Sequence, residues 1–458
     1  MQESTAPLLD LDSVLSANAR PDNAEQNSFA SNIPDAPDSL DDAGLTASFV
    51  QDLMIKHLYR AGVLTGRELA THIHLPYLLI EPILEDIVDI AYAEKRGGQG
   101  LGASLDRFAL TDSGKSQARD LLHIDTYIGA APVPIEQYAE YVIKHDLNSL
   151  DVNEQLLRQA WRNFILDDEL FAQIGPAICS GKSCFLYGPP GTGKTTIAKA
   201  IARLLDETVG WIAIPHAIIV GDSLIRIYDP VYHNAVKIQK ENDPSSLWMN
   251  DATSDQRWVT CHRPCVMVGG ELTLDMLDLR YNATAKFYEA PLQVKANGGV
   301  FIIDDFGRQL VQPRDLLNRW IVPLEERIDF LTLDTGKKFT VPFEELVVFA
   351  TNLDPKDLAD EAFLRRIRYK IYIGEPSAKA YKAIFKKECS KKQLQYSVDD
   401  LEAIIKKFYV QAKRPLRACD PRDITDWIAD HCKFNNQPRT ISGPTLDAIF
   451  TSYMQELR

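Results

Sequence analysis

One stretch of sequence constrains this chain of 458 residues more than any other. The string FLYGPPGTGKTT, residues 185–196, contains the pattern G-x-x-x-x-G-K-T from Gly188 to Thr195. An apolar run typical of a strand precedes the pattern, and the helix-like string IAKAIARLL follows it. Strand, glycine-rich loop and helix in this order are the context that a phosphate-binding P-loop requires. The stretch therefore predicts a site for a nucleoside triphosphate.

The residues of this loop have distinct expected roles. The glycines let consecutive backbone N–H groups turn towards phosphate oxygens, and the N-terminus of the following helix adds partial positive charge. Lys194 is expected to reach the β- and γ-phosphates, and the Thr195 hydroxyl is expected to ligate Mg²⁺. The predicted binding loop consists of Gly188, Pro189, Pro190, Gly191, Thr192, Gly193, Lys194, Thr195 and Thr196.

Two further apolar runs end in polar residues suited to nucleotide hydrolysis. The run GGVFIIDDFGR leads to Asp304, expected to hold the Mg²⁺ shell, and to Asp305, expected to orient the attacking water. The run LVVFATNLDP leads to Asn352, which is placed to position water near the γ-phosphate. The alternative interpretation of the first run is a buried strand that ends in a solvated acidic turn.

Three arginines extend this set. Arg365 and Arg366 follow a short helical run, and Arg422 lies in the first turn of a later helix. A cation in a first turn opposes the helix dipole, so Arg422 is expected to serve an anion. For each arginine taken alone, a surface salt bridge is the favoured interpretation. Because the three follow the P-loop and the two strands in order, a role at the nucleotide site is favoured for the set.

With these residues, the chain from about 150 to 458 resembles the AAA+ ATPases. Gly188–Thr195 is similar to Walker A and Ile302–Asp305 to Walker B. Asn352 resembles sensor 1, Arg366 or Arg365 the arginine finger, and Arg422 sensor 2. The resemblance implies an α/β fold with a parallel sheet, a C-terminal helical lid, ATP and Mg²⁺ as cofactors, and a ring, expected to be a homo-hexamer. Catalytic roles are then expected for Lys194, Asp305, Asn352, Arg365 and Arg366.

One departure from the family leaves the reaction rate open. The family usually ends Walker B with Asp-Glu, whereas this chain has Asp304-Asp305. Aspartate is one methylene shorter than glutamate, so the attacking water is held differently. A fast ATPase and an ATP-gated scaffold with very slow hydrolysis are both consistent with this pair.

The spacing of the motifs indicates a branch of the family. Lys194 and Asp304 lie about fifty residues further apart than a minimal strand–helix–strand–helix–strand path requires, with the surplus expected within 221–298. A strand–turn–strand pattern with Asp334-Thr335-Gly336 at the reversal predicts a hairpin before Asn352. Both features resemble the helix-2-insert branch, and KFYEAPLQVKANGGVFIIDDFGR looks most like the MoxR type. That resemblance implies remodelling of an unknown client protein.

Charge, hydropathy and cysteine spacing exclude several other classes of function. A net charge of −14 argues against a chain built mainly to coat nucleic acid. No apolar run approaches 18 residues and no leader opens the chain, so a cytoplasmic protein without membrane insertion is expected. The spacing of Cys261 and Cys265 is ligand-like, but a strand turn with two buried thiols is favoured over a metal site.

The remaining sequence predicts five segments. Residues 1–44 are acidic and expected to be disordered. Residues 45–125 are expected to form a winged-helix domain in which Thr65 and Glu68 make a capping box. A linker and helix at 126–155, an αβα core at 156–372 and a helical lid at 373–458 complete the division.

The third helix of the winged-helix segment opposes DNA binding. In a DNA complex this helix would enter the major groove. All of its charged residues are acidic, namely Glu81, Glu85, Asp86 and Asp89. Phosphate contacts need Lys or Arg. Protein docking is therefore favoured, and a DNA-linked motor or transcription regulator stays as the alternative.

Overall fold

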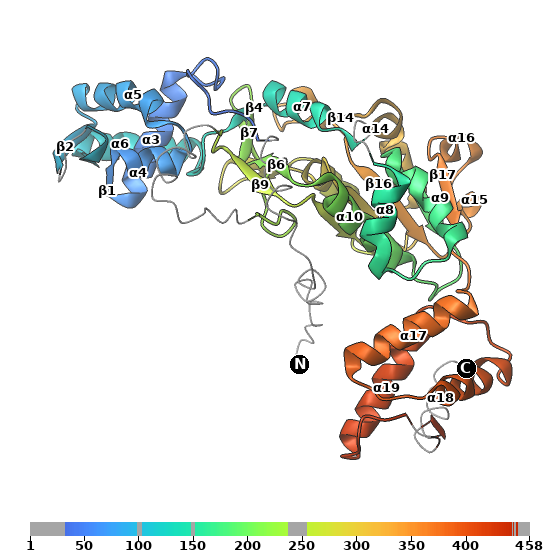
Figure 1. The fold of residues 1–458 in the computed structure, drawn as a ribbon. Helices are drawn as coiled ribbons and strands as arrows, with labels where there is room; N and C mark the ends of the chain where they lie inside the picture. The colour runs from blue at the N-terminus through green and yellow to red at the C-terminus, as the bar shows by residue number, and fades with distance from the viewer. Residues whose placement is uncertain are drawn as a thin grey trace, which may run out of the picture.

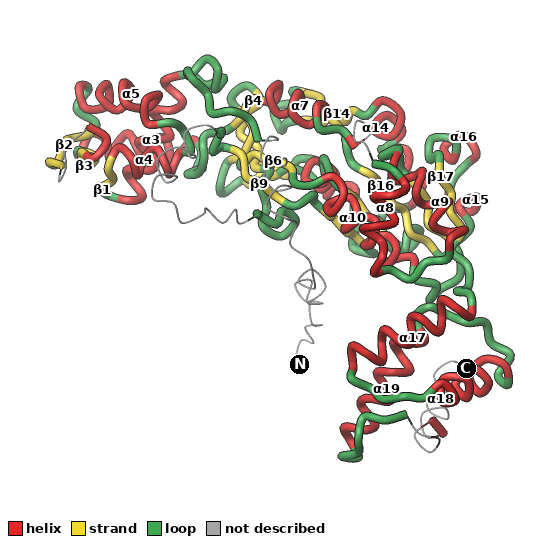
Figure 2. The backbone as a smooth tube through the Cα atoms, viewed as in Figure 1, coloured by secondary structure: helices red, strands yellow, loops and turns green. Residues whose placement is uncertain are grey.

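The computed structural model describes residues 33–98, 103–147, 152–236 and 254–441, together with 443, 446 and 447. Along this chain an N-terminal helical unit, a central region with the sheets and a C-terminal helical unit follow one another (Figures 1 and 2). Most of the predicted acidic tail, part of the predicted wing and insert, and the end of the predicted lid lie outside the described residues.

A five-stranded sheet forms the core, with strand order β10-β13-β16-β5-β17. Every neighbouring pair is parallel, which confirms the predicted α/β fold with a parallel sheet. Apart from the edge strand β17, which contains the exposed Lys370, the strands are short, continuous apolar runs, as expected for a sheet covered on both faces. Their bounds are β5 Cys184–Tyr187, β10 Cys265–Val268, β13 Val300–Ile303, β16 Leu346–Thr351 and β17 Tyr369–Tyr372.

Helices cover both faces of this parallel sheet. One face packs against α8 (Glu154–Ala160), α9 (Asp168–Cys179) and α10 (Lys194–Val209). The other packs against α12 (Leu292–Ala296), α13 (Pro313–Arg319) and α16 (Glu361–Leu364). Successive strand residues alternate between the two layers because the side-chain period of a strand is two. Helices α14 (Ile321–Glu326) and α15 (Pro355–Leu358) complete the surroundings of the sheet.

The predicted hairpin before Asn352 is confirmed. Strands β14 (Ile328–Thr332) and β15 (Lys338–Pro342) pair antiparallel. Gly336 adopts φ 82° at the reversal, a conformation that favours glycine, and its N–H donates to the Leu333 carbonyl at 2.7 Å.

Strands of the inserted chain, together with β4 from before the P-loop, form a second, mixed sheet with strand order β11-β12-β8-β7-β4. Its strands are β4 (Val133–Pro134), β7 (Ala217–Val220), β8 (Ser223–Arg226), β11 (Arg280–Asn282) and β12 (Phe287–Glu289). The pair β6 (Ile212–Pro215) and β9 (Trp258–Cys261) packs beside it, as does α7 (Ile135–Lys144). The spacing of the motifs predicted that the added chain starts at residue 221. It starts earlier, because β6 and β7 directly follow α10.

Cys261 and Cys265 flank the turn between β9 and β10, and both are free thiols. Cys261 is buried as predicted, but Cys265 is exposed. The difference arises because β10 is an edge strand of the parallel sheet.

The N-terminal unit consists of α3 (Ala47–Ala61), β1 (Val63–Thr65), α4 (Gly66–Ile73), α5 (Tyr77–Asp89), β2 (Ala93–Gly98), β3 (Asp106–Leu110) and α6 (Asp112–Ile124). Its three strands form an antiparallel sheet in the order β1-β3-β2. The predicted capping box is confirmed: the Thr65 hydroxyl accepts from the Glu68 N–H at 3.1 Å, and the Glu68 carboxylate accepts from the Thr65 N–H at 2.7 Å.

Residues 33–44, predicted as part of the disordered tail, are packed against the rest of the molecule. Asp35 forms a β-bridge with Ser254, and Ala43 is fully buried. The N-terminal unit also joins the mixed sheet, since Ala217 and Leu224 belong to its apolar core. The acidic composition of residues 33–44 did not predict this packing. The contacts are made by backbone pairing and by one small buried side chain, and neither depends on the charge of the segment.

The C-terminal unit has α17 (Ala378–Lys392), α18 (Val398–Ile405), a π-helical turn (Lys406–Val410) and α19 (Asp420–Phe434). These elements enclose their own apolar core, and Figure 1 shows them below the central sheets. Ser397 and Asp400 form a capping box at the start of α18. Among the described residues, no helix combines the length and apolar character that crossing a membrane requires.

Candidate nucleotide-binding site

The P-loop joins the end of β5 to the start of α10. Gly188, Gly191 and Gly193 have φ values of 140°, 78° and 94°, which residues with a side chain rarely adopt. A Cβ on Gly188 would also lie 2.4 Å from the Ile373 carbonyl oxygen. Because α10 begins at Lys194, its first backbone N–H groups have no partners within the helix and are available to an anion.

Lys194 lies folded over the loop. Its ammonium group donates to the carbonyl oxygens of Gly188 and Pro189 at 3.0 and 2.7 Å. Burial lowers the pKa of Lys194, whereas Asp305 and Asp304 act to raise it. The cation is therefore held where phosphate oxygens can replace the two carbonyls.

Thr195 and Asp304 meet below the loop, as the sequence predicts for two ligands of one cation. The Thr195 hydroxyl lies 2.9 Å from both carboxylate oxygens of Asp304. A hydroxyl and a carboxylate supply the oxygen ligands that Mg²⁺ prefers, so these two residues fit a magnesium ion.

Asp305 and Asn352 form a second contact at the same edge of the sheet. The Asn352 amide donates to the Asp305 carboxylate at 3.1 Å, and Asp305 adopts φ 49°, unusual outside glycine. Since β5, β13 and β16 are parallel, the residues after their ends share the carboxyl edge, where open α/β sheets bind ligands. Gln309, which the sequence did not single out, donates to the Asp304 carbonyl at 2.9 Å and steadies this turn.

The two finger candidates have different surroundings. The Arg365 side chain is 77% exposed and pairs with Glu361 at 3.2 Å. Arg366 is less exposed and pairs with Glu325 of α14 at 2.8 Å. Within the described part of the chain, no hydrogen bond or ion pair joins Arg365 to the P-loop of the same subunit.

A shallow cavity of about 300 Å³ lies beside Arg365. Its lining comprises Tyr187, Asp354, Pro355, Lys356, Glu361, Leu364, Arg365 and Lys370.

The C-terminal unit touches the P-loop, but not through Arg422. Arg422 is 66% exposed, and its guanidinium pairs with Asp423 at 3.0 Å. The Cys419 N–H instead donates to the Gly191 carbonyl at 3.1 Å. The sequence missed this contact, because the chain before α19 carries no recognisable motif.

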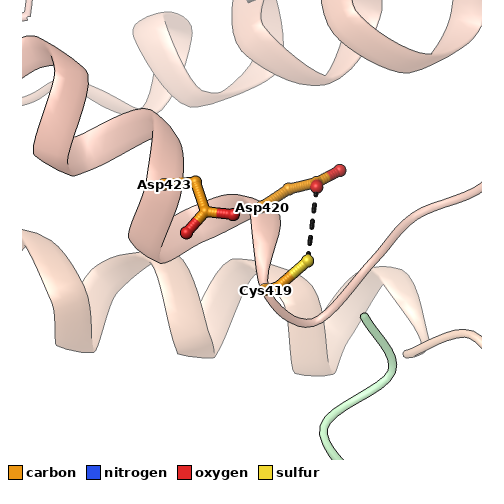
Figure 3. Close-up of side chains that lie close together, drawn as sticks. All are labelled: Cys419, Asp420 and Asp423. Atoms are coloured by element: carbon orange, nitrogen blue, oxygen red, sulfur yellow. Dashed lines mark hydrogen bonds between the residues drawn. The ribbon is translucent and has the colours of Figure 1, made fainter. Parts of the chain in front are cut away.

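Figure 3 shows Cys419, Asp420 and Asp423 close together at the start of α19. Their carboxylates already have protein partners. Asp420 accepts from the Tyr409 hydroxyl at 2.7 Å and from Arg414 at 3.2 Å, and Asp423 pairs with Arg422. This group therefore anchors the helix within its own unit.

Comparisons with protein families agree with this site. Residues 184–252 match the family described as "ATPase family associated with various cellular activities (AAA)". Residues 377–449 match a domain described as "Domain of unknown function (DUF8689)". The first of these matches includes the whole P-loop.

Sequence comparison also finds curated relatives of this chain. A proteasome-activating nucleotidase of Archaeoglobus fulgidus is 28% identical over 236 residues, which cover 49% of this chain and 56% of the relative. A 26S proteasome regulatory subunit 6B homolog of Dictyostelium discoideum is 23% identical, covering 61% and 68%. The chain thus spans only 56% of the length of the archaeal relative.

Among solved structures, NtrX of Brucella abortus with ADP matches at 12% identity and a TM-score of 0.38, over 74% of this chain and 66% of that one. RuvB of Thermotoga maritima matches at 14% identity and a TM-score of 0.36, over 63% and 71%. Both are distant likenesses.

Proposed function

We propose that this chain is an Mg²⁺-dependent ATPase of the AAA+ type that works in a ring and remodels client proteins in the cytoplasm. The observation that carries the proposal is the meeting of Thr195 and Asp304 below the P-loop, with Asp305 and Asn352 beside them. Four residues from three parts of the chain converge there, in the arrangement that phosphoryl transfer from a bound triphosphate requires.

Each side chain then has a task in hydrolysis. The loop N–H groups and Lys194 bind the phosphates and stabilise the charge of the transferring group. Thr195 and Asp304 would hold Mg²⁺, which would neutralise phosphate charge when bound. Asp305 orients the attacking water, and Asn352 fixes the Asp305 carboxylate through the 3.1 Å hydrogen bond. Because Asp305 is short, slow hydrolysis is the alternative outcome.

The ring is supported by the position of the finger candidates. Arg365 projects into solvent, whereas Arg366 is engaged with Glu325. We infer that Arg365 acts on the nucleotide of a neighbouring subunit. The relatives named as proteasome-activating nucleotidase and 26S proteasome regulatory subunit support ATP-driven work on proteins. The inserts and the hairpin β14–β15 support a MoxR-like form of this work.

The direct test is ATP binding by the full chain, measured by calorimetry with Mg²⁺. Lys194→Ala removes the phosphate-binding cation and should lower ATP affinity at least about 100-fold, or about 2.7 kcal/mol. Lys199→Ala is the matched control, because Lys199 is exposed on the same helix. Unchanged affinity in a folded Lys194→Ala protein would refute the site.

The ring is tested by mixing two inactive variants. Lys194→Ala subunits keep their fingers, and Arg365→Ala/Arg366→Ala subunits keep their P-loops. Mixed assemblies should regain part of the ATPase activity, since one variant completes the site of the other. No recovery in assemblies of verified mixed composition would contradict catalysis between subunits.

Client selection is assigned to the N-terminal unit, which we interpret as a winged helix. Helix α5 presents Glu85, Asp86 and Asp89 to solvent, beside the 77% exposed Leu78. This face repels phosphates and suits a protein partner. The full chain should therefore show no duplex-DNA binding near 150 mM salt, where weak electrostatic binding fades. Micromolar, salt-sensitive binding would favour the DNA-linked alternative.

A further inference from the structure

A single buried hydroxyl joins the two chain segments that carry Asp305 and Asn352. Thr351 is the last residue of β16 and is 0% exposed. Its hydroxyl donates to the Phe306 carbonyl at 2.7 Å and accepts from the Leu353 N–H at 3.1 Å. The hydroxyl therefore connects the residue after Asp305 to the residue after Asn352, and so sets the spacing between these two segments.

The turn after β13 has further contacts with β16. The Phe306 N–H donates to the Ala350 carbonyl at 2.8 Å, so both backbone polar groups of Phe306 are bonded to β16. The Phe306 side chain is 1% exposed. A Cβ on Gly307 would lie 3.1 Å from Cδ1 of Leu353, which shows how closely the turn packs against the chain after Asn352. Packing of this density leaves the turn little freedom to move relative to β16.

Gln309 closes the same turn from within. Its amide group donates to the Asp304 carbonyl at 2.9 Å and accepts from the Gly307 N–H at 2.7 Å. Asp305 lies between these two bonds with φ 49°. A residue with a side chain keeps this sparsely populated conformation only where its surroundings hold it there. The two bonds of Gln309 supply that restraint.

We propose that Thr351 and Gln309 are positioning residues for ATP hydrolysis, which hold the Asp305 carboxylate beside the Asn352 amide. The proposal rests on the ATPase function proposed above. An aspartate side chain is short, so the backbone of the turn decides where its carboxylate lies. The 3.1 Å bond from Asn352 to Asp305 requires the turn and β16 to keep their present spacing.

This role concerns the rate of hydrolysis and leaves nucleotide binding aside. Among the described residues, the hydrogen bonds of the Thr351 and Gln309 side chains go to the turn and to the chain after β16, and none goes to the P-loop. A catalytic group misplaced by about 1 Å can cost about 100-fold in rate. Loss of either positioning residue should therefore lower kcat without lowering the affinity for ATP.

The test measures steady-state ATP hydrolysis and, by calorimetry, ATP affinity of the full chain. Thr351→Val removes the hydroxyl and should lower kcat at least about tenfold. ATP affinity should change less than about threefold, within the range of substitutions away from a binding site. Thr351→Ser returns the hydroxyl and should restore most of kcat. Thr208→Val is the matched control, since it removes a hydroxyl bonded to the Leu204 carbonyl at the far end of α10.

Gln309→Ala gives an independent measurement. Gln309 is only half-buried, so its loss should leave the fold intact even if Thr351→Val does not fold. It should also lower kcat at least about tenfold at unchanged ATP affinity. In an Asp305→Asn background, Gln309→Ala should slow hydrolysis less than about threefold further, because residues that act through one group are not additive.

Three results would overturn this inference while leaving the ATP site intact. These are a wild-type kcat in Gln309→Ala or in a folded Thr351→Val protein, a full further loss of rate in the Asp305→Asn background, and a wild-type protein that binds ATP without hydrolysing it. A wild-type protein that binds no ATP would overturn the proposed function as well.

Discussion

The two sheets of this protein are built in opposite ways. In the parallel sheet β5, β13 and β16 are continuous apolar strands, and a residue of the candidate site follows the end of each. The mixed sheet combines strands drawn from residues 133–134, 217–226 and 280–289, some of them only two or three residues long. The comparison teaches that local sequence patterns can mark a candidate catalytic site, whereas a sheet that supports a neighbouring unit can be assembled from short strands that no local pattern marks.

The two sheets also differ in what stabilises them. Aromatic and aliphatic layers bury both faces of the parallel sheet. The mixed sheet depends in addition on buried polar groups that join distant segments. Arg257, for example, is bonded to Asp255 and to the carbonyls of Ala43 and Pro132. We therefore expect the two regions to respond differently to substitution and to pH.

The largest expected effect is the loss of Arg257. Arg257→Ala leaves Asp255 buried without its cation, at a cost of about 3–5 kcal/mol. Denaturation followed by tryptophan fluorescence should report this loss, while ATP affinity persists. The control Arg226→Ala removes a half-exposed pair with Glu289 and should cost about 1 kcal/mol or less. If Arg257→Ala abolished ATP binding in a folded protein, the stability of the mixed sheet and ATP binding at the parallel sheet would not be independent.

The next effect concerns the parallel sheet alone. Asp305→Asn should slow phosphate release at least about 100-fold, since a positioned carboxylate contributes 10²–10⁴-fold to such steps. Asparagine tolerates the left-handed backbone found at this position, so stability should hold. Asp304→Asn should instead weaken Mg²⁺-dependent binding. Wild-type turnover in Asp305→Asn would move the catalytic role elsewhere, with Glu271 after β10 as a candidate.

Acid should weaken the mixed-sheet region. Burial lowers the pKa of His216 and of His233 to about 4, with His74 facing the first and Asp229 and Lys295 facing the second. Because the unfolded chain binds protons more readily, stability is present above pH 6.5 and lost as pH falls towards 4. For both histidines together, lowering the pH from 6 to 5 should cost about 2 kcal/mol.

This acid effect is measured as the free energy of unfolding at pH 6 and pH 5. His233→Gln should remove about half of the 2 kcal/mol that these two histidines contribute. An identical dependence in that variant would show that other groups titrate, and would weaken the contrast between the two regions.

The smallest effect tests a purely local signal. Thr65→Ala removes the capping box of α4 and should destabilise the N-terminal unit by about 1 kcal/mol. Thr65→Ser keeps the hydroxyl and serves as control. Ser397→Ala makes the matched change in the C-terminal unit. Hydrogen exchange should show that the loss of amide protection is confined to the unit that carries the substitution. Loss of protection in both units would show that their stabilities are coupled.

Much of the site was predictable because its residues are local to strand ends. The P-loop, Asp304, Asp305 and Asn352 each follow an apolar run, and parallel strands bring such positions to one edge. The capping box of Thr65 and Glu68 and the hairpin at Gly336 were also predictable, because each depends on a pattern within a few residues. Arg422 shows the limit, since its place at a helix start was correct but its side chain turns to Asp423.

The sequence by itself determined the parallel α/β core, the phosphate-binding loop and the carboxylates beside it, because these depend on backbone geometry within a few residues. Only the tertiary structure decided three other features. Residues 33–44 pack on the molecule, β4 completes a sheet of inserted strands, and the chain before α19 rests on Gly191. Each depends on contacts between segments far apart in the chain, and such contacts are selected by shape and by unpaired backbone groups, which composition and periodicity do not record.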